Sequence, residues 1–251
     1  MPLSLVAYYE SIDPAAAWEN LAAVPDPHVS VSGDDISVPE LDQLVMAAAV
    51  IDQTVASRAR VHTPSLNEDG FDEYLTRLAS GLVFGSPAEI HDRSEEPLQL
   101  KQTEAMQFQV LTNPAAAAGH YGLVWLGDGK PTPVTGRIRT IRATAAVALA
   151  AGAWVNGAIT FPVSLAAGKY QVVGMRANGT NLVAARLLFG GQGSRPGCPA
   201  VNDEPDQDYP IFRNGELGVW GEFSNSNPPT LDALGITDTA QELFLDLIQV
   251  G

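Results

Sequence analysis

Four carboxylates crowd into one short segment of the chain, Asp203-Glu204-Pro205-Asp206-Gln207-Asp208. Carboxylates at alternate positions of a loop can converge on Ca²⁺, which takes about six to eight oxygen ligands. The segment lacks the glycine and the closing glutamate of a helix-loop-helix calcium site. A solvated acidic loop is therefore the favoured interpretation. The alternative is a Ca²⁺ site, and it is the single cofactor that the sequence suggests; its ligands would be Asp203, Glu204, Asp206 and Asp208.

The other reactive residue types do not form a catalytic pattern. The histidines, none of which has the spacing of a zinc hydrolase, are His28, His62, His91 and His120. No Gly-x-Ser-x-Gly elbow occurs, and the run Gly190-Gly191-Gln192-Gly193-Ser194 lacks the lysine of a phosphate-binding loop. Cys198 is the single cysteine, so an intrachain disulfide is impossible. Catalytic groups can also assemble from distant residues, but these observations favour a protein that is not an enzyme.

Charge is distributed unevenly along the chain. Residues 1–135 carry a net charge of −13 and residues 136–251 a net charge of −2. Phosphate contacts require clustered Lys or Arg, so we expect no sequence-specific binding of nucleic acid. The one local basic cluster comprises Arg137, Arg139 and Arg142. It is interpreted either as a charged edge strand that resists aggregation or as a contact with the acidic half of an adjacent subunit.

Short apolar segments separated by Gly, Pro, Asn or Asp fill the second half of the chain. They predict strands at residues 137–149, 153–161, 169–177, 181–189, 217–223, 230–236 and 241–250. Such a series of short strands is typical of a β-sandwich or a jelly roll. Trp125, Trp154, Tyr170, Trp220 and Phe223 lie in predicted strands of the two halves, where we expect them to belong to the core.

The first half of the chain is less regular. Strands are predicted at residues 3–9, 28–38, 98–101, 105–111 and 120–126. Residues 41–51 and 54–62 fit either a hairpin or a short helix followed by a strand. Helical spacing of apolar side chains predicts a helix over residues 71–80, on the positions Phe71, Tyr74, Leu75, Leu78 and Leu82.

A stretch rich in Gly and Pro, residues 127–133, separates the two halves. The sequence therefore predicts an all-β protein of two jelly-roll or β-sandwich domains in tandem, at residues 1–134 and 135–251, with a short helix inserted in the first. Residues 98–121 and 147–170 align without a gap. The distance in sequence between the two segments is too short for a repeat of whole domains. A common pattern of short strands and turns therefore explains the similarity better than duplication does. The chain shows neither a secretory signal nor an apolar run of the ~20 residues that span a membrane, and we expect a soluble protein.

Three segments of the second half carry a resemblance to a known family. They read Leu165-Ala166-Ala167-Gly168-Lys169-Tyr170-Gln171-Val172-Val173-Gly174-Met175-Arg176, then Ala184-Ala185-Arg186-Leu187, then Gly218-Val219-Trp220-Gly221-Glu222-Phe223, and a closing strand follows at 243–250. This series resembles the second jelly roll of the double jelly-roll major capsid proteins of tailless, membrane-containing bacteriophages.

The resemblance implies a structural subunit of the virion, assembled in the host cytoplasm. It implies homotrimers that self-assemble into an icosahedral shell, contacts with other virion proteins, and a face toward a membrane or genome. The alternative from another class is a carbohydrate-binding or adhesion β-sandwich. That alternative predicts a monomer with exposed tryptophans, whereas the capsid interpretation predicts buried tryptophans and large homo-oligomers.

Overall fold

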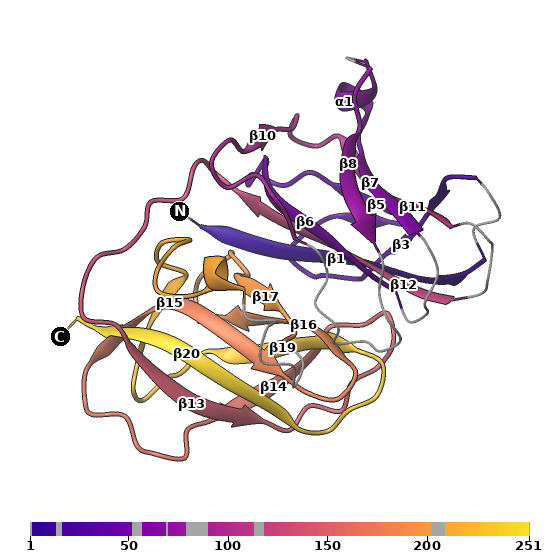
Figure 1. Ribbon diagram of the computed structural model, residues 1–251. Coiled ribbons are helices and arrows are strands. Elements are labelled where there is room, and N and C mark those ends of the chain that lie inside the picture. The colour runs from indigo at the N-terminus through magenta and orange to yellow at the C-terminus, as the bar shows by residue number, and fades with distance from the viewer. Residues whose placement is uncertain are drawn as a thin grey trace.

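A computed structural model describes residues 2–13, 17–51, 57–68, 70–78, 90–112, 118–201 and 209–250. Figure 1 shows two sheet-built bodies, one above the other. We call them the N-terminal roll, made of strands β1 to β12, and the C-terminal roll, made of strands β13 to β20. No helix of the described residues is long and apolar enough to cross a membrane.

The C-terminal roll has the strand order of a jelly roll. Its strands are β13 (Arg139–Ala145), β14 (Val155–Thr160), β15 (Lys169–Asn178), β16 (Leu182–Leu188), β17 (Gly197–Pro199), β18 (Gly221–Ser224), β19 (Thr230–Gly235) and β20 (Gln241–Gln249). The order β13-β20-β15-β18 forms one layer and β14-β19-β16-β17 the other. Numbered along this roll, the layers read 1-8-3-6 and 2-7-4-5, which is the double Greek key of a jelly roll. Strand β14 joins the layers because it pairs with β19 at its start and with β13 at its end.

The N-terminal roll repeats this order with two broken strands. Its strands are β1 (Leu3–Ile12), β2 (Glu19–Asn20), β3 (Ala22–Ala23), β4 (Val31–Ser32), β5 (Asp35–Ser37), β6 (Gln43–Ile51), β7 (Ser57–His62), β8 (Glu73–Leu78), β9 (Ile90–Asp92), β10 (Leu98–Gln99), β11 (Ala105–Thr112) and β12 (Ala118–Gly127). The inner sheet runs β3-β1-β12-β6, with β9 and β10 both on β6. The outer sheet runs β4-β5-β11-β7-β8, with β2 also on β11. The chain is therefore two jelly rolls in tandem, as the sequence predicts.

The inner sheet of the N-terminal roll is buried on both faces. Along β1, Leu3, Leu5 and Ala7 belong to a core shared with the C-terminal roll, while Val6 and Tyr8 belong to the core of the N-terminal roll. This alternation follows from the two-residue period of a strand. Every residue of β12 is buried as well. The sheets consequently stack in layers, with the inner sheet between the outer sheet and the C-terminal roll (Figure 1).

A buried arginine lies at the contact between the rolls. The Arg186 side chain of β16 is 1% exposed and donates to the carbonyl oxygen of Leu5 at 2.9 Å. It also donates to Asp26 Oδ2 of the N-terminal roll at 2.5 Å and to Asp232 Oδ2 of its own roll at 2.9 and 3.1 Å. Its guanidinium carbon lies 4.1 Å from the centre of the Trp154 ring. One cation therefore binds carboxylates of both rolls.

Further hydrogen bonds cross the same contact. The Tyr121 hydroxyl donates to the carbonyl of Gly235 at 2.9 Å, and Trp125 Nε1 donates to the carbonyl of Gly197 at 2.8 Å. The Leu5 N–H donates to the carbonyl of Arg195 at 2.8 Å. Buried polar groups cost stability when they lack partners, so these bonds fix how the rolls sit on one another.

The helix predicted over residues 71–80 is wrong. Residues Glu73–Leu78 form strand β8, which pairs with β7, and residues 79 and 80 lie outside the described residues. Phe71 and Tyr74 are exposed while Glu73 and Leu75 are buried, so the strand alternates where a helical stripe was expected. The helix of this region is α1 (Pro64–Glu68), just before the predicted position.

The other strand predictions are confirmed in their main features. Every strand predicted in the second half contains one of β13 to β20 or overlaps it. Neither alternative for residues 41–51 and 54–62 is correct: these ranges contain the strands β6 and β7, but the two strands lie in different sheets and form no hairpin. The short strands β2, β3, β9 and β17 were not predicted. The sheets of the two rolls separate between residues 127 and 139, and the domain boundary at 134 stays a prediction.

The substitution Arg186→Met should destabilise the protein strongly. It leaves Asp26 and Asp232 buried without their cation, a loss of about 3–5 kcal/mol for a broken buried pair. We would measure the free energy of unfolding in urea. Arg142→Met is the control, since the Arg142–Glu242 pair is exposed and should contribute roughly 0–1 kcal/mol. Equal losses in the two variants would contradict a central role for Arg186.

Candidate functional site

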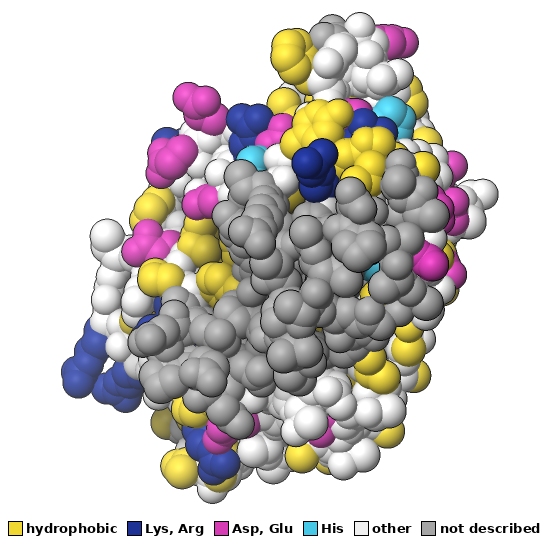
Figure 2. Space-filling model, turned by 45° about the vertical axis from the view of Figure 1, so that its right-hand side comes forward, with side chains coloured by type: hydrophobic (Ala, Val, Ile, Leu, Met, Phe, Trp, Pro, Cys, Tyr) yellow, Lys and Arg dark blue, Asp and Glu magenta, His cyan; other side chains and the backbone are white. Residues whose placement is uncertain are grey.

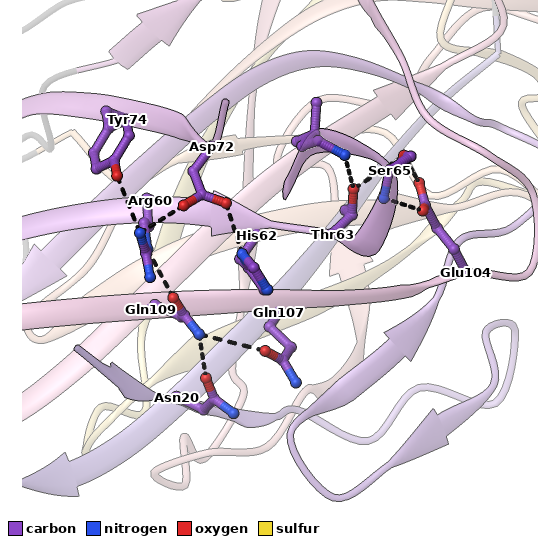
Figure 3. Close-up of polar contacts among 11 residues, drawn as sticks. Asn20, Arg60, His62, Thr63, Ser65, Asp72, Tyr74, Glu104, Gln107 and Gln109 are labelled. Atoms are coloured by element: carbon purple, nitrogen blue, oxygen red, sulfur yellow. Dashed lines mark hydrogen bonds and ion pairs between the residues drawn. The ribbon is translucent and has the colours of Figure 1, made fainter. Parts of the chain in front are cut away.

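The exposed face of the outer sheet carries a connected polar and aromatic network (Figure 3). In β7, Ala59 and Val61 face the core, so Arg60 and His62 point the other way. In β11, the buried residues Met106, Phe108 and Val110 alternate with two glutamines, Gln107 and Gln109. Strand alternation thus places a row of polar side chains on this face.

Asp72 organises the row. Its carboxylate accepts from Arg60 Nη1 at 2.5 Å and contacts His62 Nδ1 at 2.6 Å. Arg60 in turn donates to Gln109 Oε1 at 2.7 Å and to the Tyr74 hydroxyl at 3.0 Å. The Asp72 side chain is 8% exposed. Hydrogen bonds with Arg60 and His62 therefore compensate the negative charge of a nearly buried carboxylate.

Aromatic side chains flank this network. The Arg60 guanidinium carbon lies 4.4 Å from the centre of the Trp18 ring, and Trp18 meets Tyr74 edge-on at 5.9 Å. Tyr74 is 53% exposed and Phe71 72% exposed. Figure 2 shows hydrophobic side chains beside basic and histidine side chains on the upper part of the molecule, where the N-terminal roll lies. We call Trp18, Arg60, Phe71 and Tyr74 the aromatic patch.

A second cluster holds α1 against the same sheet. Glu104 accepts from the Ser65 hydroxyl at 2.7 Å and from the Ser65 N–H at 3.1 Å. Burial alone would raise the pKa of Glu104, but hydrogen bonds from Ser65, Lys101 and Thr63 outweigh it and lower this pKa. These hydrogen bonds hold α1 in place and occupy the Glu104 carboxylate, which is therefore a structural group.

The geometry suits binding better than nucleophilic catalysis. His62 and Asp72 resemble the base and orienting acid of a hydrolase, but Arg60 already neutralises that acid. No hydroxyl or thiol of a described residue forms a hydrogen bond with His62 Nε2. A fixed polar row beside exposed aromatic rings is the composition of a protein contact surface.

A buried carboxylate at the edge of the N-terminal roll joins its two sheets. Glu73 of the outer sheet contacts His91 Nε2 at 2.5 Å and accepts from Arg93 Nε and Nη2 at 2.6 and 2.8 Å. Burial acts to raise the pKa of Glu73, but the hydrogen bonds and charges of His91 and Arg93 lower it to about 2.

The predicted Ca²⁺ ligands Asp203, Glu204, Asp206 and Asp208 lie outside the described residues. Among the residues that the structure does describe, no group of three or more His, Cys, Asp or Glu could hold a metal ion. The calcium site therefore stays a prediction.

The basic cluster lies on an exposed part of the C-terminal roll. Arg137, Arg139 and Arg142 are all exposed, and Arg142 pairs with Glu242 of the neighbouring strand. The first residues of β13 pair with β20 on one side, and β14 joins the other side only from Thr144 onward. The predicted edge is therefore present in the first part of this strand.

The predicted core aromatics are buried with one exception. Trp125, Tyr170, Trp220 and Phe223 are at most 6% exposed, and the half-buried Trp154 packs against the same core. The sequence analysis does not predict the aromatic patch. Part of it could have been found, because Arg60 and His62 are two positions apart in a predicted strand and so lie on one face.

Comparison with known proteins gives one structural similarity to report. The chain is similar to the major capsid protein P2 of bacteriophage PM2, with 10% sequence identity and a TM-score of 0.27, over 99% of this chain and 98% of that chain. No family model and no curated protein matches the chain. The jelly-roll assignment rests on the strand order of the two rolls.

Stability should depend on pH through Glu73. Its folded pKa of about 2 lies below the ordinary 4.5, so its contribution of about 3 kcal/mol is present above pH 4.5 and is lost as pH falls toward 2. The difference in unfolding free energy between the wild type and Glu73→Gln should shrink over that range. Urea titrations at stepped pH would measure it.

Glu68→Gln is the matched control for this titration. The Glu68 side chain is 73% exposed beside Lys101, and its replacement should change stability little at any pH. A wild-type advantage over Glu73→Gln that stays constant between pH 7 and 2.5 would disprove the assignment.

Proposed function

We propose that this protein is a structural subunit of a virion shell. The observation that carries the proposal is the pair of jelly rolls with one strand order, joined in a single chain by a buried contact. Jelly rolls are the fold of many capsid subunits, as well as of lectins and cupins. A shell subunit needs stiff walls that keep their mutual position under load, and the stacked sheets supply them.

The tryptophans favour this proposal over a glycan-binding sandwich. Trp125 and Trp220 are 0% and 2% exposed. Arg186 lies over the Trp154 ring and Arg60 over the Trp18 ring. A sugar platform needs an open aromatic face, and each described tryptophan is either buried or covered by an arginine.

Contacts between subunits would use the outer surfaces. The inner sheet is occupied on both faces, which leaves the aromatic patch and the exposed arginines of β13 as contact surfaces. Aromatic residues and Arg are enriched in protein interfaces. The proposal includes homotrimers, a location in the virion, contacts with other virion proteins, and no enzymatic activity.

Native mass is the direct test of the proposal. Sedimentation velocity and negative-stain microscopy of the purified protein should show trimers, tiled sheets or closed shells. A stable 26.5 kDa monomer at high protein concentration would refute the shell proposal. Saturable glycan binding by that monomer would instead support the lectin-like alternative.

The double substitution Phe71→Ser and Tyr74→Ser should weaken self-association at least tenfold and lower the unfolding midpoint only slightly, since the hydrogen bond that Tyr74 accepts from Arg60 is exposed. Both rings are exposed, so their loss removes contact area but little of the core. Val163→Ser is the control, because Val163 is 67% exposed on the C-terminal roll, away from the patch. Sedimentation equilibrium would compare the three proteins. Unchanged association of the double variant would remove the aromatic patch from the proposed interface.

A further inference from the structure

A groove of about 1060 Å³ lies at the boundary of the two rolls. Residues 37–41 line it from the N-terminal roll, and Gly221 and Glu222 of strand β18 line it from the C-terminal roll. Strand β18 is the last strand of its layer, and among the described strands it pairs with β15 alone. The groove therefore lies beside a sheet edge that no other described strand covers.

The buried charges behind the groove balance one another. Arg186 binds the buried carboxylates of Asp26 and Asp232. The same two carboxylates also act favourably on the buried cation of Arg195. Two anions and two cations cancel, so any charge that the groove presents to solvent comes from the exposed residues of its lining.

Glu40 and Glu222 are the exposed carboxylates of that lining. Glu40 forms no ion pair with a described residue. Glu222 lies 3.7 Å from the amino group of Lys169, and this exposed pair contributes roughly 0–1 kcal/mol. The groove thus presents negative charge that no strong ion pair neutralises, and it favours a cationic partner over an anion.

A matching pair of cations lies at the opposite edge of the same layer. Arg137 and Arg139 are exposed and form no ion pair with a described residue, whereas Arg142 pairs with Glu242. They lie at the start of β13, where the strand pairs with β20 on one side and with no described strand on the other. Such a charged edge repels an edge of like charge and admits an acidic one.

The two surfaces cannot meet within one subunit. Strands β20 and β15 separate β13 from β18. Three strand spacings of about 4.8 Å place these edges about 14 Å apart. In Figure 1, β13 lies on the side of the C-terminal roll that is away from the N-terminal roll. A contact between the arginines and the groove therefore joins two copies through unlike surfaces, and contacts of this kind can close into rings such as trimers.

We propose that the groove receives the arginine edge of β13 from a second copy of the chain. Arg137 and Arg139 of one copy face Glu40 and Glu222 of the next. Opposite charges on the two surfaces then set the direction of the contact, and the like edges of two copies repel each other. The inference rests on the proposed shell function and deepens it, because it names the surface that the arginines meet.

Charge reversal in the full chain tests this contact, with sedimentation equilibrium as the measurement. The groove variant carries Glu40→Arg and Glu222→Arg, and the edge variant carries Arg137→Glu and Arg139→Glu. Each should associate at least about tenfold more weakly than the wild type, because like charges then meet. The fourfold variant with all these substitutions should associate within about threefold of the wild type, because its charges are exchanged and not removed.

The control variant carries Glu95→Arg and Glu96→Arg. Both residues are exposed on the N-terminal roll and neither lines the groove, so the change in net charge equals that of the groove variant. Its association should equal that of the wild type. Added salt should weaken wild-type association, since exposed charges are screened beyond about 10 Å at 0.1 M salt.

The outcomes separate this contact from the shell proposal. A wild type that stays monomeric at high concentration refutes both. If the wild type associates and the groove and edge variants associate equally well, the contact alone is overturned. A fourfold variant that remains as weak as the groove and edge variants also overturns it, as does a control variant that weakens association to the same extent.

Discussion

The buried charge of Arg186 is the constraint on which the arrangement of the rolls depends. A guanidinium removed from water requires compensation, and here Asp26 and Asp232 supply it from opposite sides of the contact. Replacing such a group of charges by apolar side chains is often neutral for stability, so its value lies in specificity. A shifted stacking of the rolls that separates Arg186 from Asp26 would leave these charges buried and unpaired across the contact.

The second constraint is the two-sided burial of the inner sheet. Antiparallel sheets commonly expose one face to water, but this sheet packs against a core on each face. Its strand β12, which is buried throughout, therefore offers no surface to other molecules. Among the described residues, the exposed aromatic rings Phe71 and Tyr74 belong to the outer sheet of the N-terminal roll or to the segment just before it.

Much of the fold could be predicted from local sequence, but only where strands are long enough to show a pattern. The connection between β15 and β16 is Gly179-Thr180-Asn181, a short turn that contains the residue types typical of hairpins. Strands β9 and β17 have three residues each, which is too few to show a periodic pattern of apolar residues. In the region of β8, the apolar residues happen to be spaced as they would be in a helix. The similarity of residues 98–121 and 147–170 matches β11 with β14, which are strands at different places in the jelly-roll order. This sequence similarity therefore reflects a common pattern of short strands and turns and not the repeat of the jelly roll.

The sites were harder to predict because their residues meet only in the folded chain. Arg60 and His62 could be placed on one strand face, but Trp18 and Asp72 come from irregular segments. At the contact between the rolls, Ser4 and Arg195 are joined by a hydrogen bond although 191 positions separate them in the sequence. Arg186 illustrates the limit: an arginine in the apolar strand Leu182–Leu188 implies that a buried anion must exist, since such a charge is almost never buried alone. Sequence cannot say which of the acidic residues it is, because that choice depends on how the surfaces of the two rolls meet in the folded chain.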